Sequence, residues 1–282
     1  MRSCVKTARS RAFTLIELLA VISTTGILAV LAVGVSQKAI HSANKAREVN
    51  AARQLVTAFH AYAQENNGIY LSGMDYRAGT ADYPVHNLDG KLVTGHGAHR
   101  YPYRLAPYLE GEFDGTIFVN RNKQEIASSA GGSNVMYDYY VSTFPALGMN
   151  IYCVGGVIRA NGSMLNSADC ITRAAGMRGS ILAFASGGSG SGRSRMQGFS
   201  YVSPPTRENE SPICLKWQDP STWTKHKDPM NFGWVDFRYD GKAVSAFLDG
   251  SVRMCSVTEL SDMRLWNHNA LEQDNPNYEI AP

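Results

Sequence analysis

The feature that most constrains the fold is a long segment, from Phe13 to Ala63, that contains no proline and is rich in good helix formers. In its second half, residues 37–64, apolar side chains recur every three or four positions and polar ones fall between them. That spacing places the apolar side chains on one face of a helix. At about 1.5 Å per residue, such a helix would be roughly 75 Å long. We therefore expect one long N-terminal helix over residues 13–65.

The first half of this segment has a different composition. The run from Leu18 to Val35 carries no charged side chain and reaches the length of a membrane-spanning helix. These residues predict a single transmembrane segment over residues 13–35, with its basic end held in the cytoplasm. The residues before the span hold basic side chains and no acidic one: Arg2, Lys6, Arg9 and Arg11.

A plain signal anchor would account for the basic start and the apolar run, but not for Glu17. A carboxylate at the centre of a membrane helix costs roughly 2.5–3.5 kcal/mol, less near an interface, and usually has a partner. A cut between Ala12 and Phe13 would create a new α-amino group close to Glu17. Between two staggered parallel helices, the carboxylate of one could then meet the ammonium of the next and set the register of a stack.

The sequence RAFTLIELL, residues 11–19, closely resembles the processing site of type IV pilins and type II secretion pseudopilins. The resemblance implies that the leader, residues 1–12, is removed by a prepilin peptidase after Ala12. It also implies that Phe13 is N-methylated and that Glu17 acts in filament assembly. The resemblance further implies a single-pass protein of the inner (cytoplasmic) membrane, with its head in the periplasm or on the cell surface. One position departs from the family, because Ala12 stands where the residue before the cut is usually Gly.

After the helix the composition changes, and Asn66–Asn67–Gly68 has the chemistry of a helix stop. We expect residues 66–282 to form a globular head that is rich in antiparallel β-structure. The fold class predicted for the whole chain is therefore α+β and pilin-like, with the head packed against the long helix. Candidate strands cover residues 134–143, 151–158 and 180–185, and residues 101–111 predict a short irregular helix.

Residues 186–195 are rich in glycine and serine. The sequence GGSGSG is similar to a phosphate-binding loop but lacks the Lys-Ser/Thr that gives such a loop its chemistry. A flexible surface loop is the more economical interpretation.

Two Asp-Gly pairs, at residues 240–241 and 249–250, have the chemistry of hairpin turns. They predict a three-stranded antiparallel meander over residues 234–239, 242–248 and 251–257. Ser256 and Glu259 then have the spacing of a capping box that opens a short helix through Trp266.

The same stretch resembles the C-terminal motif of a bacterial pilin-like subgroup, in which a His precedes an Asp-Gly pair by ten positions. Here the position of the His is occupied by Tyr239, and the pair is Asp249–Gly250. We expect a structural, turn-forming role for Asp249 rather than a catalytic one.

Once Cys4 has left with the leader, an even number of cysteines remains, which favours disulfides in an oxidising compartment. The pairing that we prefer is Cys153–Cys170 with Cys214–Cys255, although two other connectivities are compatible with the sequence. Buried, reduced thiols are the alternative.

Composition and motifs argue against several classes of protein. Removal of the four leader cations leaves 23 of the 27 basic side chains against 24 acidic ones, so a nucleic-acid-binding surface is not indicated. Only His96 and His99 lie close together, and no recognisable metal, cofactor or catalytic motif is present. We therefore expect a protein that is not an enzyme and has no cofactor.

The hypothesis that follows is a pseudopilin-like subunit that assembles into a cell-envelope fibre, for type II secretion or a related pilus. Its expected partners are other pilin-like subunits, the prepilin peptidase/methylase, the assembly platform and the lipid bilayer. The alternative is a membrane-anchored extracellular module whose head recognises carbohydrate or a secreted polymer, since the Tyr and Trp residues could supply a sugar-binding surface.

Overall fold

The computed structural model describes residues 14–165, 168–176, 179–205 and 216–280. The chain divides into two compact units, Met1–Ala43 and Asn44–Pro282. The boundary falls inside the first helix, α1 (Leu15–Glu65). Each unit is therefore described by itself.

The first unit holds the N-terminal part of α1. In the described part of the chain, no helix combines the length and the apolar character that a membrane crossing requires. The predicted transmembrane segment 13–35, the membrane-spanning part of the predicted fold class, is corrected accordingly, and the described residues form an α+β fold.

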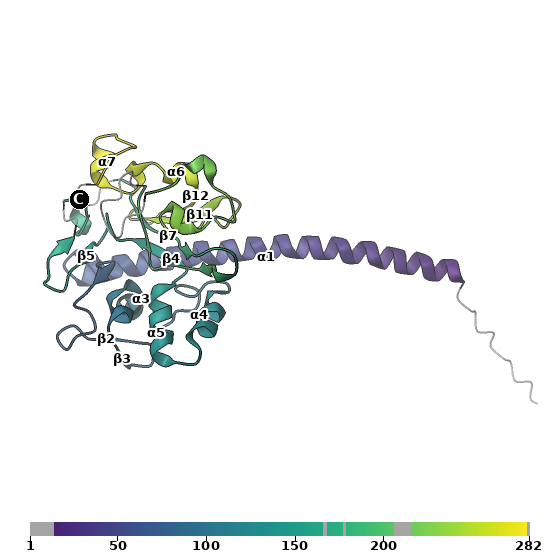
Figure 1. The fold of residues 1–282 in the computed structure, drawn as a ribbon, viewed down its shortest axis with the longest axis horizontal. Coiled ribbons are helices and arrows are strands. Elements are labelled where there is room, and N and C mark those ends of the chain that lie inside the picture. The colour runs from purple at the N-terminus through teal and green to yellow at the C-terminus, as the bar shows by residue number, and fades with distance from the viewer. Residues whose placement is uncertain (1–13, 166–167, 177–178, 206–215, 281–282) are drawn as a thin grey trace, which may run out of the picture. The chain divides into compact units, whose positions relative to one another are not determined.

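The second unit is built on a five-stranded sheet in the order β10-β4-β7-β11-β12 (Figure 1). The outer pair β10/β4 is parallel, and the other three pairs are antiparallel. The sheet of the head is thus mainly antiparallel, as predicted, with one parallel pair at its edge. The strands are β10 (Tyr201–Val202), β4 (Leu147–Asn150), β7 (Leu182–Ser186), β11 (Lys242–Phe247) and β12 (Val252–Ser256).

The part of α1 that belongs to this unit forms the centre of its core. Ala51, Leu55 and Phe59 recur at helical spacing and are fully buried. The ring of Phe59 stacks on Tyr70 at 5.0 Å between centroids and meets Phe184 of β7 edge-on at 5.5 Å. Burial of these rings fixes the helix against the sheet.

The helix ends where the sequence indicates. Asn67 and Gly68 have positive φ values of 54° and 75°, and the N–H of Gly68 donates to the carbonyl of Ala63 at 2.7 Å. A left-handed residue at this point terminates a helix by turning the chain back onto its last carbonyls.

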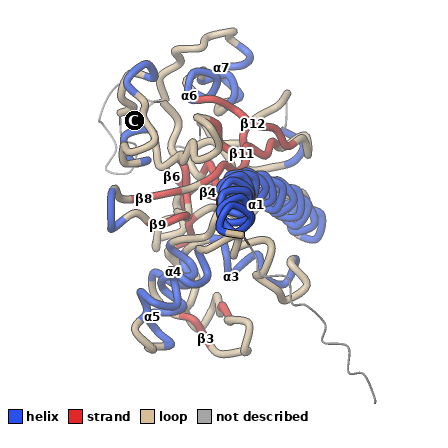
Figure 2. The backbone as a smooth tube through the Cα atoms, turned by 90° about the vertical axis from the view of Figure 1, so that its right-hand side faces the viewer, coloured by secondary structure: helices blue, strands red, loops and turns tan. Residues whose placement is uncertain are grey.

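Short helices lie on the other side of α1 from the β11–β12 hairpin (Figures 1 and 2). They are α2 (His96–His99), α3 (Tyr101–Leu105), α4 (Asn122–Ala130) and α5 (Asn134–Thr143). The prediction of a short irregular helix near residue 101 is confirmed by α3 and the single 3₁₀ turn Ala106–Tyr108. Small strands complete the unit: β1 (Met74–Asp75), β2 (Val85–His86), β3 (Leu92–Val93), β5 (Val157–Ile158), β6 (Met164–Leu165), β8 (Gly188–Ser189) and β9 (Met196–Gln197).

Two of the predicted strands are wrong in whole or in part. Residues 134–143 form the helix α5 because Ser133 caps its first turn by accepting from the N–H of Met136. Tyr140 also stacks on Phe144, four positions later, at 5.6 Å between ring centroids, and a pair at that spacing supports a helix. Of residues 151–158, only β5 is a strand. The third candidate is confirmed by β7.

The C-terminal hairpin is confirmed, but the meander is not. β11 and β12 pair across Asp249–Gly250, and the other Asp-Gly pair forms a turn with positive φ at both residues, 54° and 79°. Residues 234–239 form no strand; they contribute single bridges instead. The predicted capping box of Ser256 and Glu259 is present and opens α6 (Val257–Leu260), which is shorter than expected and is followed by a 3₁₀ turn and α7 (His268–Glu272).

Candidate functional site

The start of α1 is organised around Glu17. Its Oε2 accepts hydrogen bonds from the backbone N–H and the hydroxyl of Thr14, both at 2.9 Å. In return, the N–H of Glu17 donates to the Thr14 hydroxyl at 3.2 Å. This reciprocal pair is a capping box, which satisfies donors that a helix start leaves open. The spacing Thr-x-x-Glu in the sequence could have revealed it, since the same pattern identified the box at Ser256.

The capping box changes the interpretation of Glu17. The hydrogen bonds from the backbone and then the hydroxyl of Thr14 lower the pKa of its carboxyl below the ordinary value. The side chain is therefore an exposed anion at neutral pH, at the end of a helix where negative charge is favourable. It is available to a cation from another molecule, and it also has a role within its own helix.

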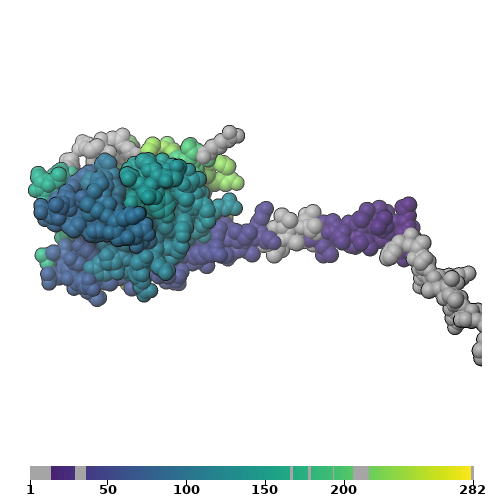
Figure 3. Space-filling model, turned by 90° about the horizontal axis from the view of Figure 1, so that it is seen from below, coloured from purple at the N-terminus to yellow at the C-terminus, as the bar shows by residue number. Residues whose placement is uncertain are grey.

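Large apolar side chains surround this carboxylate and are exposed. Leu15 is 83% exposed and Ile16 is 77% exposed. Large apolar side chains that are exposed together on a folded chain mark contact sites. Figure 3 draws this N-terminal segment in purple. The others in the segment are Leu18, Leu19, Val21, Ile22, Ile27 and Leu28. The predicted processing residues, Ala12 and Phe13, lie outside the described residues.

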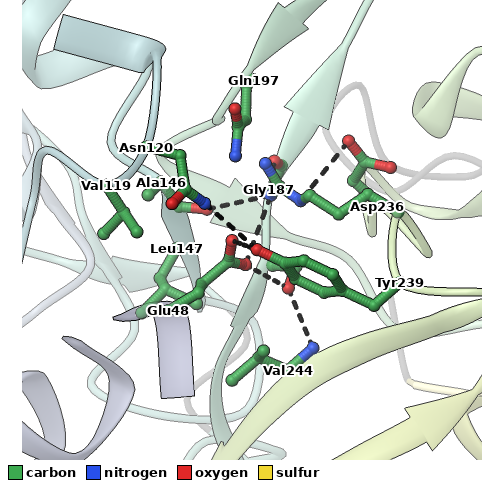
Figure 4. Close-up of polar contacts among 12 residues, drawn as sticks. Glu48, Val119, Asn120, Ala146, Leu147, Gly187, Gln197, Asp236, Tyr239 and Val244 are labelled. Carbon is green, nitrogen blue, oxygen red and sulfur yellow. Dashed lines mark hydrogen bonds and ion pairs between the residues drawn. The ribbon is translucent and has the colours of Figure 1, made fainter. Parts of the chain in front are cut away.

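A second constellation lies inside the head and is centred on Glu48 of α1, which is fully buried. The hydroxyl of Tyr239 donates to Oε2 of Glu48 at 2.6 Å, and the hydroxyl of Ser186 donates to Oε1 at 2.5 Å (Figure 4). Ser186 in turn accepts from the N–H of Val244 at 2.9 Å. The carboxylate of Glu48 thus links α1 to β7 and to the segment that leads into β11.

A buried cation compensates the charge of Glu48. Nη2 of Arg238 lies 3.6 Å from Oε1 of Glu48, and Nε lies 3.7 Å from the carboxylate of Asp236. Asp236 also pairs with Arg195 at 2.6 Å. Burial of the guanidinium disfavours its charge, but the carboxylates of Glu48 and Asp236 outweigh that cost and raise the pKa of Arg238.

The structure assigns structural positions to the three residues of the C-terminal motif. Burial, followed by the charge of Glu48, raises the pKa of Tyr239, so that its phenol remains a hydrogen-bond donor at neutral pH. Asp249 accepts from the N–H and the hydroxyl of Ser251, at 2.9 and 2.6 Å, and Gly250 has a φ of 82°. Tyr239 is thus part of the Glu48 network, while Asp249–Gly250 is a separate hairpin turn.

The preferred disulfide pairing is not formed. Cys153 and Cys170 are both buried thiols, so the Cys153–Cys170 bridge is corrected, and Cys255 is a buried thiol as well. Burial raises the pKa of the Cys170 thiol to about 12, which keeps it protonated and unreactive at neutral pH. Cys214, the expected partner of Cys255, lies outside the described residues.

The head also contains a cavity of about 610 Å³ walled partly by Tyr62, Tyr83 and Tyr103. Its charged groups are already engaged, since Asp75 pairs with Arg77 at 2.9 Å and Arg104 donates to the backbone carbonyl of Ser72 at 2.6 Å. Within the described ranges, no three His, Cys, Asp or Glu side chains come together as a metal site would require.

Comparison of the chain with models of protein families, with curated proteins and with solved structures found no match.

Proposed function

We propose that this chain is a pilin-like subunit that is processed between Ala12 and Phe13 and assembles into a cell-envelope fibre. The observation that carries the proposal is the surface of residues 14–28, where large apolar side chains are exposed around an ionised Glu17. Self-association would remove these apolar side chains from water, which is the main favourable term in protein association.

Cleavage after Ala12 gives a reason for the position of Glu17 at the start of the apolar segment. Removal of the leader takes Arg2, Lys6, Arg9 and Arg11 from the start of the chain and leaves a single ammonium at Phe13. An unpaired carboxylate inside an apolar interface would be costly, whereas a carboxylate paired with the ammonium of a neighbouring subunit also fixes the register of the stack. Methylation of Phe13 by the processing enzyme and a dedicated assembly platform complete the proposal, with the head in the periplasm or on the cell surface.

The experiment compares fibre formation by the parent chain, by Glu17→Ala and by Glu112→Ala in cells that contain the peptidase. Glu112 is an exposed carboxylate of the head and serves as the matched control. We expect the Glu17 variant to be processed but to assemble poorly, and the Glu112 variant to behave as the parent. N-terminal sequencing should find Phe13 first; a mature chain that starts elsewhere, or a Glu17 variant that assembles normally, would contradict the proposal.

A further inference from the structure

A cleft of about 500 Å³ opens on the head between the glycine- and serine-rich loop and residues 223–229. Both segments belong to the second unit. The volume lies in the range of pockets that hold one or two rings of a small ligand. The residues that matter are Arg195, Trp223, Lys225, His226, Lys227 and Arg238.

Hydrogen bonds join the two walls of the cleft. Arg195 of the glycine- and serine-rich wall donates to the backbone carbonyl of Lys225 at 3.0 Å and to Asp236 at 2.6 Å. On the opposite wall, Nζ of Lys227 donates to Oε1 of Gln218 at 2.8 Å. Arg195 and Lys227 are therefore held in place in the lining of a formed recess.

The cleft carries a positive charge that comes from two lysines. The lining contains four basic side chains, besides His226, and one carboxylate, Asp236. Arg195 pairs with Asp236 and Arg238 with the buried Glu48, so Lys225 and Lys227 remain without a carboxylate partner among the lining residues. Within the described part of the chain, Nε and Nη1 of Arg238 are buried without a hydrogen-bond acceptor. A recess lined by one sign of charge concentrates ligands of the opposite sign.

An aromatic ring supplies the second element of recognition. Trp223 lies in the lining beside the cations and makes an edge contact with Phe237, 6.2 Å between ring centroids. Aromatic side chains present a large apolar face at little cost in conformational entropy. The apolar face of a sugar ring can pack on such a surface while its charged substituent meets the lysines.

We propose that this cleft binds an acidic saccharide, a sugar ring that carries a sulfate or carboxylate group. The GGSGSG sequence lacks a lysine of its own, and the fold brings Lys225 and Lys227 to it from a distant segment. The anionic group lies between these lysines and the loop, and the ring lies against Trp223. The site is independent of fibre assembly.

Isothermal titration calorimetry of the full chain tests the site with four probes: a sulfated hexasaccharide, a hexasaccharide of uronic acid, neutral maltohexaose and inorganic sulfate. We expect binding of the sulfated or the uronic probe, weakened as salt rises because the contact is electrostatic. Maltohexaose and inorganic sulfate should each bind at least tenfold more weakly, because each lacks one of the two elements of recognition.

Charge-reversal variants distinguish binding in the cleft from general electrostatic attraction to the protein. Lys225→Glu with Lys227→Glu should weaken binding of the acidic saccharide at least tenfold. Lys91→Glu with Arg121→Glu makes the same change in net charge at exposed positions outside the cleft and should leave affinity unchanged. Trp223→Ala should weaken binding of the saccharide but not that of inorganic sulfate. Near-ultraviolet circular dichroism checks that each variant retains the parent fold.

Three results would overturn the proposal: no binding of either acidic saccharide, equal losses in the two double variants, or equal affinity for maltohexaose. Binding of inorganic sulfate as tight as that of the sulfated hexasaccharide would refute the saccharide ring as part of the ligand. None of these results bears on processing or assembly, so the two proposals fail independently.

Discussion

At the scale of single residues, the Glu48 network shows how a buried charge is retained. A fully buried carboxylate needs several donors as well as a counter-ion. Tyr239 and Ser186 supply the hydrogen bonds, and Arg238 supplies the positive charge. Removal of one donor leaves the others in place, whereas removal of the charge of Arg238 leaves an anion that the apolar interior cannot stabilise.

Tyr239→Phe tests the contribution of one donor. The ring stays and the hydroxyl is lost, so Glu48 loses a bond of 2.6 Å inside the core. We expect the free energy of unfolding to fall by about 1–3 kcal/mol, the cost of leaving a buried polar group without its partner. Urea unfolding measures it, with Tyr83→Phe as the control, because Tyr83 is half-exposed. Equal losses for the two variants would show that the bond to Glu48 is not the cause.

The capping box of Thr14 and Glu17 predicts a pH dependence at the start of α1. The pKa of Glu17 is lowered below its usual value of 4.5. A group whose pKa is lowered by folding contributes stability above its unfolded value, and the contribution is lost as pH falls through the folded value. Carbon chemical shifts of residues 15–18 should therefore report a helix that frays as pH falls below 4.5.

Glu17→Gln keeps the shape of the side chain but removes the titration. Its chemical shifts at residues 15–18 should stay constant over the same pH range, while those of the parent change. Thr14→Val should fray this turn at every pH, because it removes the hydroxyl that both donates to and accepts from Glu17. A parent helix that shows no change below pH 4.5 would argue against the box.

At the scale of elements, the part of α1 from Asn44 to Glu65 holds the head together. Phe59→Ala removes a fully buried ring that touches both Tyr70 and β7. We expect a loss of about 3–5 kcal/mol in the free energy of unfolding, from lost burial and the cavity left behind. Gln54→Ala, on the exposed face of the same helix, should change it by less than about 0.5 kcal/mol. A small effect of Phe59→Ala would mean that the core closes around the missing ring.

Elements defined by local chemistry could be predicted from the sequence. The end of α1 at Gly68, the Asp-Gly turns and the Ser256 cap each depend on a few neighbouring residues, and each is confirmed. The helix α5 was mistaken for a strand because its aromatic and β-branched residues favour strands on average. Its cap at Ser133 and the contact of its Asp138 with the hydroxyl of Tyr103, 2.7 Å long, outweigh that preference.

Contacts between distant residues could not be predicted in the same way. Glu48 and Tyr239 are separated by 191 positions, and Lys225 reaches Arg195 across 30 positions. In the sequence, Glu48 is one of the polar residues between the apolar positions of the predicted helix, and residues 225–227 belong to no recognisable motif. Because one sequence contains no record of which residues meet, these sites emerge only from the fold.

At the scale of the whole molecule, the boundary between the two units predicts which part folds alone. Among the described side chains of α1, Glu48 is the first that is buried, and the head unit begins at Asn44. A chain of residues 40–282 retains these residues with an additional helical turn. Its free energy of unfolding should lie within about 1 kcal/mol of that of the full chain, because the described side chains of the deleted segment, residues 14–28 and 36–39, are all exposed. Guanidinium unfolding of both chains, followed by tryptophan fluorescence, measures the difference.

The same truncation separates folding from association. Residues 40–282 lack the exposed apolar side chains of residues 14–28, so this chain should stay monomeric in sedimentation experiments under conditions in which the full chain associates. A chain of residues 64–282 serves as a control for the part of α1 that lies in the core. It loses Leu55 and Phe59, each worth about 2–5 kcal/mol in a core, and a domain has only about 5–15 kcal/mol in total. We expect it to be unfolded. If residues 40–282 associate as the full chain does, the assembly surface lies in the head; if they fail to fold, the first unit stabilises the second.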